Sequence, residues 1–109
     1  MITVTYHRDR HRLTMEGHAQ SAEKGHDLVC ASATILAYTL AQFVKNMNDA
    51  GQVRYPTLEL KDGYTLIDCN PPNRIKNSVK LAFDTVCAGF ELLARDFPDN
   101  ISYQIMGMK

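Results

Sequence analysis

The fold is decided first by residues 29–47, which read VCASATILAYTLAQFVKNM. Apolar residues in this stretch recur at steps of three and four, which places them on one side of an α-helix. Asp27 stands just ahead as the predicted N-cap, and Gly51 follows as the predicted C-terminal glycine. The spacing predicts a long amphipathic helix with an apolar stripe of Val29, Ala33, Leu36, Leu40, Phe43 with Val44, and Met47.

A second stretch, residues 75–97, has the same periodicity. Pro71 and Pro72 precede it and Pro98 follows it, and proline is tolerated at the start of a helix but not in its interior. The predicted apolar stripe is Ile75, Val79, Ala82, Val86, Phe90, Leu93 and Phe97. The chain therefore has two amphipathic helices, and each needs a surface to cover.

Five short segments alternate apolar and polar residues, the pattern of strands with one buried face. They are residues 2–6, 13–18, 55–61, 64–69 and 101–105. The pair Asp62-Gly63 predicts a two-residue hairpin turn, because both residue types tolerate a positive φ. The order β-β-α-β-β-α-β predicts an α+β fold, a two-layer sandwich in which two amphipathic helices pack on a mostly antiparallel sheet.

The composition of the chain argues against several classes of protein. The 109 residues carry 12 Lys+Arg and 12 Asp+Glu, so the formal net charge is zero. A neutral chain lacks the overall basic field of a protein devoted to bulk nucleic-acid binding, although the basic residues at 8–12 could make a local contact from a hairpin tip. Three cysteines without a Cys-x-x-Cys pair argue against a disulfide framework or a structural zinc site.

The chain also lacks recognisable targeting features. No apolar run approaches the ~20 residues of a membrane span. The N-terminus has neither the basic start nor the apolar block of a signal peptide. We therefore expect a single cytoplasmic domain over residues 1–109, with no membrane association.

One segment combines residues that could perform chemistry. It reads Gly17-His18-Ala19, then five residues, then Gly25-His26-Asp27-Leu28-Val29-Cys30-Ala31. Cys30 is predicted in the first helical turn, where free backbone N–H groups and the positive end of the helix dipole favour a thiolate. The N–H groups of Cys30 and Ala31 could also receive the oxyanion of an attacked carbonyl.

The residues around Cys30 have compatible roles. His18 ends a predicted strand and could take the proton of Cys30, as in a Cys-His dyad. Gly17 and Gly25 bracket a predicted mobile loop at residues 19–26 and would act as its hinges. Asp27 could orient an imidazole or contact a substrate, and Thr34 shares the helix face of Cys30.

Each candidate also has a simpler interpretation. A free cysteine is commonly a buried packing residue, and Asp27 needs no role beyond capping a helix. Cys69 and Cys87 are predicted to be inert packing thiols, and His7 and His11 to lie on a solvated hairpin. A metal held by Cys30, His18 and His26 would lack any recognised ligand spacing, so no metal is expected.

The segment from Gly17 to Ala31 resembles the signature of the ribosomal-processing cysteine proteases, the Prp family. The resemblance extends along the whole chain, from the opening Met-Ile-Thr-Val strand to the Asn-Ile strand after the second helix. It matches Cys30 to the nucleophile, His18 to the catalytic histidine and Asp27 to a supporting acidic position. The family usually has serine where this chain has Thr34, which keeps the hydroxyl and adds a methyl group.

The resemblance implies a cysteine endopeptidase that removes the N-terminal extension of a large-subunit ribosomal protein, cutting after phenylalanine. It implies a homodimer, a loop over the site at residues 19–26, and a reaction that needs no metal, nucleotide or other cofactor. Two other functions stay open from the residues alone. One is a non-catalytic ribosome-associated binding module, and the other is a different thiol hydrolase or a redox sensor that uses Cys30.

Overall fold

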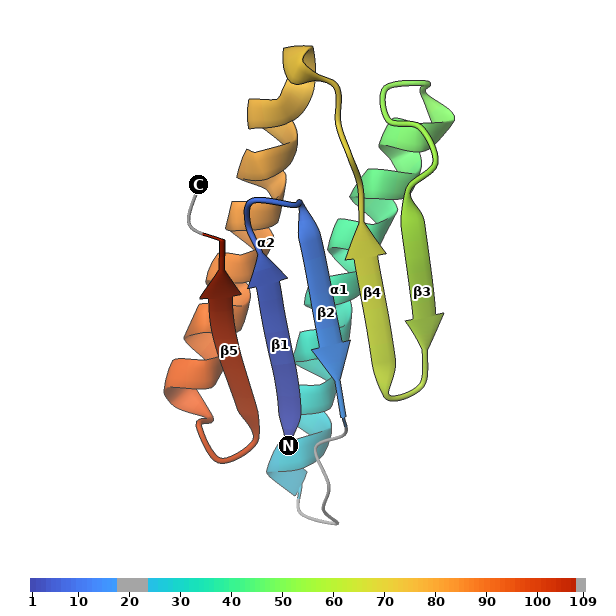
Figure 1. Cartoon of the computed structure of the whole chain (residues 1–109). Coiled ribbons are helices and arrows are strands. Elements are labelled where there is room, and N and C mark those ends of the chain that lie inside the picture. The colour runs from blue at the N-terminus through green and yellow to red at the C-terminus, as the bar shows by residue number, and fades with distance from the viewer. Residues whose placement is uncertain (18–23, 108–109) are drawn as a thin grey trace.

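The computed structural model describes residues 1–17 and 24–107, with side chains from residue 28 onward in the second range. Figure 1 shows one sheet with both helices on the same face. A 3₁₀ turn, Asn73–Ile75, precedes the second helix. The elements are β1 (Ile2–His7), β2 (Arg12–Glu16), α1 (Lys24–Asp49), β3 (Thr57–Lys61), β4 (Tyr64–Asp68), α2 (Lys76–Asp96) and β5 (Ile101–Met106). The predicted two-layer α+β sandwich is confirmed.

The sheet has the strand order β3-β4-β2-β1-β5. Only the β1–β5 pairing is parallel, and the other three pairings are antiparallel. In the β2–β4 pairing Glu16 lies opposite Tyr64. This register brings the end of β2 beside the β3–β4 turn, and the candidate active site forms there.

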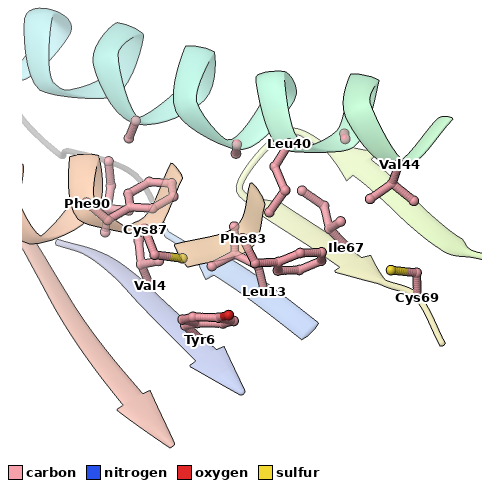
Figure 2. Packing of buried hydrophobic residues seen from close by; sticks show 14 of the residues in the cluster. Val4, Tyr6, Leu13, Leu40, Val44, Ile67, Cys69, Phe83, Cys87 and Phe90 are labelled. Atoms are coloured by element: carbon pink, nitrogen blue, oxygen red, sulfur yellow. The ribbon is translucent and has the colours of Figure 1, made fainter. Parts of the chain in front are cut away.

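The core lies between the sheet and the two helices, as Figure 2 shows. Strand β1 turns Ile2, Val4 and Tyr6 inward, as its alternation predicts. The described part of α1 is buried along one stripe: Val29, Ala33, Ala37, Leu40, Ala41 and Val44. At roughly 25 cal/mol per Å², this apolar burial is the main force that holds the helices on the sheet.

The buried stripe of α2 differs from the predicted one. Its buried residues are Val79, Phe83, Cys87 and Phe90, whereas Ala82 and Val86 are only partly buried. Phe83 stacks on Tyr6 with ring centroids 5.9 Å apart. Successive residues on a helix lie about 100° apart, so a stripe centred on the large Phe83 ring turns Ala82 toward the edge of the contact.

The helix α1 begins earlier than the sequence predicts. The helix begins at Lys24, so Gly25, His26 and Asp27 are helical residues and Asp27 is not the N-cap. Gly25 is therefore not a hinge at the end of a loop. Glycine in a helix costs only about 1 kcal/mol, and a helix packed over many turns can carry that cost.

Two glycines lie where the sequence predicts them, Gly63 in the hairpin turn and Gly51 at the C-terminal end of the first helix. Gly63 has a φ of +78° in the turn after Asp62, and Lys61 pairs with Tyr64 across it. Gly51 has a φ of +74° just beyond α1, and its N–H donates to the carbonyl oxygen of Asn48. Both positions use the positive φ that glycine adopts without a steric penalty.

His11 does not lie in a solvated turn, contrary to the prediction. It is 4% exposed, and its ring meets the Phe83 ring edge-on with centroids 6.0 Å apart. Burial, with the nearby charges of Lys76 and Lys80, lowers the pKa of His11. A φ of +52° at this residue accompanies the inward-facing position of its side chain.

One helix passes a length and composition test for a membrane span. The segment Leu28–Asp49 of α1 is long and apolar enough by these criteria alone. A single such helix is weak evidence, because the core helix of a globular domain passes the same test. In this fold the apolar stripe of α1 packs on the sheet and α2.

Candidate active site

Cys30, Thr34 and Tyr38 follow one another at steps of four along α1 and line a single cavity of about 250 Å³. The step of four keeps the three side chains on one side of the helix. Cys30 is half-buried and packs against the core, whereas Thr34 is exposed. The prediction that Thr34 shares the face of Cys30 is confirmed.

The sheet supplies the opposite wall of this cavity. Ile2 and Met15 come from β1 and β2, and Tyr64 and Thr65 from β4. Lys61, Asp62 and Gly63 line it from the β3–β4 turn. The cavity is therefore lined by a mixture of apolar and polar residues.

Gly17 fixes the corner where β2 leaves the sheet. Its N–H donates to the carbonyl oxygen of Gly63 at 2.9 Å, and its φ is +97°. A Cβ at this position would collide with the carbonyl oxygen of Met1. Gly17 is thus required by backbone crowding at the cavity wall, independently of any hinge role.

The three cysteines are free, and their surroundings differ. Cys69 and Cys87 are buried, and burial raises the pKa of each thiol to about 12. Both behave as the predicted packing thiols. Cys30 and Cys87 each line a cavity together with polar side chains, but Cys87 is 2% exposed whereas Cys30 is half-buried.

The longer helix changes the surroundings predicted for Cys30. The four free N–H groups of an α-helix belong to its first turn, which here is residues 24–27. The N–H groups of Cys30 and Ala31 lie beyond that turn, at ladder positions where each bonds the carbonyl four residues earlier. The prediction that these two amides are free oxyanion donors is therefore wrong for this conformation. Ala31 is exposed and does not line the cavity.

Other predicted site residues lie outside the described part of the chain. His18 belongs to residues 18–23, and the side chains of Asp27 and His26 are likewise not described. Gly17, the residue before His18, lines the cavity that contains Cys30. Among the described residues there is no group of three or more His, Cys, Asp or Glu side chains placed to hold a metal ion.

Most residues of the cavity wall are not predicted by the sequence pattern. Tyr38 could have been found, since it continues the Cys30–Thr34 spacing by one more step of four. Lys61 and Tyr64 could not, because only the pairing of β2 with β4 brings their turn to Gly17.

Comparisons with known proteins agree with this geometry. The model of the family described as cysteine protease Prp matches residues 1–102. No curated protein sequence matches the chain.

Two solved structures are similar over nearly the whole fold. SMU.848 from Streptococcus mutans is 27% identical over 96% of this chain and 91% of that chain, with a TM-score of 0.69. The essential ribosomal processing protease Prp from Staphylococcus aureus, solved with a covalently linked product peptide, is 25% identical. That match covers 96% of this chain and 99% of the other, with a TM-score of 0.71. The family match, which spans the cavity around Cys30, establishes that the chain belongs to the Prp family of cysteine proteases.

Proposed function

We propose that this protein is a cysteine endopeptidase that removes the N-terminal extension of a large-subunit ribosomal protein by cutting after phenylalanine. The observation that carries the proposal is a half-buried Cys30 in a cavity lined by apolar and polar residues, in a chain of this family. The Staphylococcus aureus relative is named a ribosomal processing protease, which supports the same substrate class. We expect the protein to work in the cytoplasm, where ribosomes assemble.

The cavity supports an aromatic residue on the acyl side of the cut. Ile2 and Met15 supply aliphatic surface, and Tyr38 and Tyr64 supply rings. Its volume of about 250 Å³ has room for one phenyl ring. Such a ring gains both apolar burial and edge or stacked contacts with aromatic walls.

Cys30 and His18 would carry the chemistry. His18 follows Gly17 directly in the chain, and Gly17 lines the cavity of Cys30, so this connectivity favours a Cys-His dyad. His18 takes the proton of Cys30, the thiolate attacks the scissile carbonyl carbon, the C–N bond breaks, and His18 gives that proton to the leaving amine. His18 then takes a proton from water as the water attacks the thioester, the C–S bond breaks to release the carboxylic acid product, and His18 returns the proton to the sulfur of Cys30.

Thr34 would contact the substrate. Its hydroxyl lines the cavity one helical turn beyond Cys30, where it can donate to a substrate carbonyl oxygen or to the developing oxyanion. Asp27 keeps its predicted supporting role toward the imidazole or the substrate. Neither role requires a metal or an organic cofactor.

The test uses a peptide that spans the extension and its junction, with the products read by mass spectrometry. We expect one cut after phenylalanine by the wild type and no cut by Cys30→Ala, His18→Ala or Cys30→Ser, because a hydroxyl is far harder to deprotonate than a thiol. Thr34→Val should lower the rate and Thr34→Ser should largely preserve it. Cys69→Ala is the matched control, since it removes a thiol that does not line the cavity.

Wild-type activity in Cys30→Ala or His18→Ala would exclude the dyad, and binding of the peptide without cleavage would favour a non-catalytic module. The proposal includes a homodimer through the outer surfaces of the helices. There Ile35 of α1 is 64% exposed and Leu81 of α2 is 66% exposed. Light scattering on the same preparation gives the mass in solution, and a monomeric mass would remove the dimer from the proposal.

A further inference from the structure

The net charge of zero conceals a separation of charge along the molecule. At the end where α1 finishes and α2 begins, the cations are Arg8, Arg10, Arg12, Lys45, Arg54, Arg74 and Lys76, against Asp9, Asp49, Asp68 and Asp84. At the opposite end, near Cys30, the described charges are Glu16, Asp62, Asp96 and Asp99 against Lys61, Arg95 and the N-terminal ammonium group of Met1. Figure 1 shows these two ends at opposite poles of the long axis of the sheet.

The cations of the first end fall into two groups. Arg8 and Arg12 are occupied, because they pair with Asp84 at 3.1 Å and Asp68 at 2.7 Å. In the part of the chain that the structure describes, no carboxylate pairs with Arg54, Arg74 or Lys76. These three side chains therefore keep their charge available to a partner.

Arg54 and Arg74 converge on one surface cavity of about 380 Å³ between the end of α1 and the start of α2. Gln52 and Asn70, two amide side chains, also line this cavity. Gln52 accepts a hydrogen bond from Nη1 of Arg74 at 2.6 Å, which orients the guanidinium before any ligand arrives. Paired guanidinium groups with amides beside them suit a phosphate, whose oxygens accept several hydrogen bonds at once.

Tyr55 adds an aromatic surface to this basic region. It follows Arg54 directly and is 92% exposed, the largest exposure of any described large apolar or aromatic residue. Its φ of +51° is uncommon for a bulky residue. Tyr55 does not line the cavity itself, and its place near Arg54 follows from the chain connectivity. An exposed ring next to an arginine in the chain is a feature of proteins that stack the bases of single-stranded RNA while cations hold the backbone.

We propose that Arg54, Tyr55, Arg74 and Lys76 form an RNA-binding surface, at the opposite end of the molecule from the Cys30 cavity. The cations would contact phosphates and the Tyr55 ring would stack on an unpaired base. An acidic polypeptide would satisfy the charges but would make no use of the exposed ring, so RNA fits the surface better.

That the RNA is ribosomal rests on the proposed function. A protease that trims a ribosomal protein near its RNA would then be held by one end while the other end cuts. The excess of positive charge directs the basic end toward RNA, whereas the described charges near Cys30 give no such attraction. The net charge excludes only a uniformly basic surface, and a local basic surface of this kind remains compatible with it.

The test measures binding of a short fluorescein-labelled single-stranded RNA by anisotropy between about 50 and 200 mM salt, a range over which phosphate contacts weaken strongly. Arg54→Ala combined with Arg74→Ala should lower the slope of log Kd against log salt by about 1.4, at about 0.7 per contact in single strands. Tyr55→Ala should weaken binding about fivefold or more with little change in slope. Tyr55→Phe should bind as the wild type does, because it retains the ring.

Arg95→Ala is the matched control, since Arg95 is an exposed arginine at the opposite end. Equal weakening by Arg95→Ala, or no RNA binding by the wild type at about 50 mM salt, would overturn the proposal. Polyglutamate that competes as well as RNA, with no effect of Tyr55→Ala, would replace RNA by an acidic protein partner. Cleavage of the junction peptide without RNA should be the same in all these variants. A loss of RNA binding is thereby distinguished from a failure of the proposed protease function.

Discussion

The surroundings of Cys30 and Cys87 differ although both thiols lie on the sheet-facing side of a helix. Cys87, from α2, is 2% exposed, and the Tyr103 hydroxyl donates a hydrogen bond to its sulfur. Figure 2 shows Cys87 among the rings and aliphatic side chains of the core. Cys30, from α1, is half-buried and shares a cavity with Thr34.

The polar groups next to Cys87 hold the structure together. Asp84 accepts from the Tyr6 hydroxyl at 2.8 Å and from two nitrogens of Arg8 at 3.1 Å each. These bonds tie α2 to β1, and they use both carboxylate oxygens of Asp84. A cavity of about 210 Å³ borders this network as well, but Cys87 is almost fully buried whereas Cys30 is half-buried, so the two thiols differ in exposure rather than in residue type.

Thiol alkylation gives the largest expected contrast between the two regions. With a pKa of about 12, Cys69 and Cys87 have on the order of one thiolate in 10⁵ at pH 7, and burial blocks access to both. Iodoacetamide should therefore modify Cys30 on the order of a thousandfold faster than either one, as measured by mass spectrometry of peptides after a short exposure. Denatured protein, in which all three should react alike, is the control. Comparable alkylation rates of the three cysteines in the native protein would show that Cys30 is no more reactive than the buried thiols.

A pair of glycine substitutions tests whether the wall of the Cys30 cavity is a rigid corner. Gly17→Ala adds a Cβ against the carbonyl oxygen of Met1 at a positive φ, and we expect a loss of about 2–4 kcal/mol in the free energy of unfolding. Gly51→Ala also has a positive φ but meets nothing within 4 Å, so it should cost only about 1 kcal/mol.

Urea unfolding measures both variants, and the peptide cleavage assay shows whether Gly17→Ala also disturbs the site. Similar losses for the two substitutions would mean that the contact with Met1 relaxes easily. The corner would then be a poor explanation for the position of Gly17.

The smallest expected effect on stability comes from the hydrogen bonds of Asp84 with Tyr6 and Arg8, beside Cys87. The hydrogen bonds from Arg8 lower the pKa of Asp84, so its contribution to stability is present above the unfolded pKa near 4 and lost as pH falls through the folded value. Asp84→Asn keeps an acceptor for the Tyr6 hydroxyl but removes the charge. Because the ion pair is about a third exposed, we expect a loss of only about 1 kcal/mol at pH 7.

The same substitution should cost less at pH 3, because the unfolded chain there already binds a proton at this carboxyl group and the advantage of the folded carboxylate is falling. Unfolding curves of both proteins at the two pH values give the difference directly. An equal difference at pH 7 and pH 3 would show that the charge of Asp84 is not what ties α2 to β1.

Local pattern was enough to predict much of this structure. The apolar repeats predicted both helices, and the alternation predicted all five strands, because each pattern reports which face of a segment is buried. The repeat in α2 predicted that Ala82 and Val86 are buried, whereas Phe83 and Cys87 occupy the buried positions. Neighbouring stripes on a helix have the same spacing, and only packing decides which one faces the core. His11 was misplaced for a related reason: its burial depends on contact with Phe83, far away in the sequence.

For the candidate site, the sequence alone singled out Cys30, its alignment with Thr34 on α1, and the Gly17-to-Ala31 motif of a cysteine protease family. These depend on residue identity and helical spacing, which are local. Tertiary structure decided the rest. Pairing of β2 with β4 brought the β3–β4 turn to Cys30, and only the structure showed that α1 begins as early as Lys24. Strand order also gave a neutral chain a basic end, because only non-local contacts determine which distant residues become neighbours.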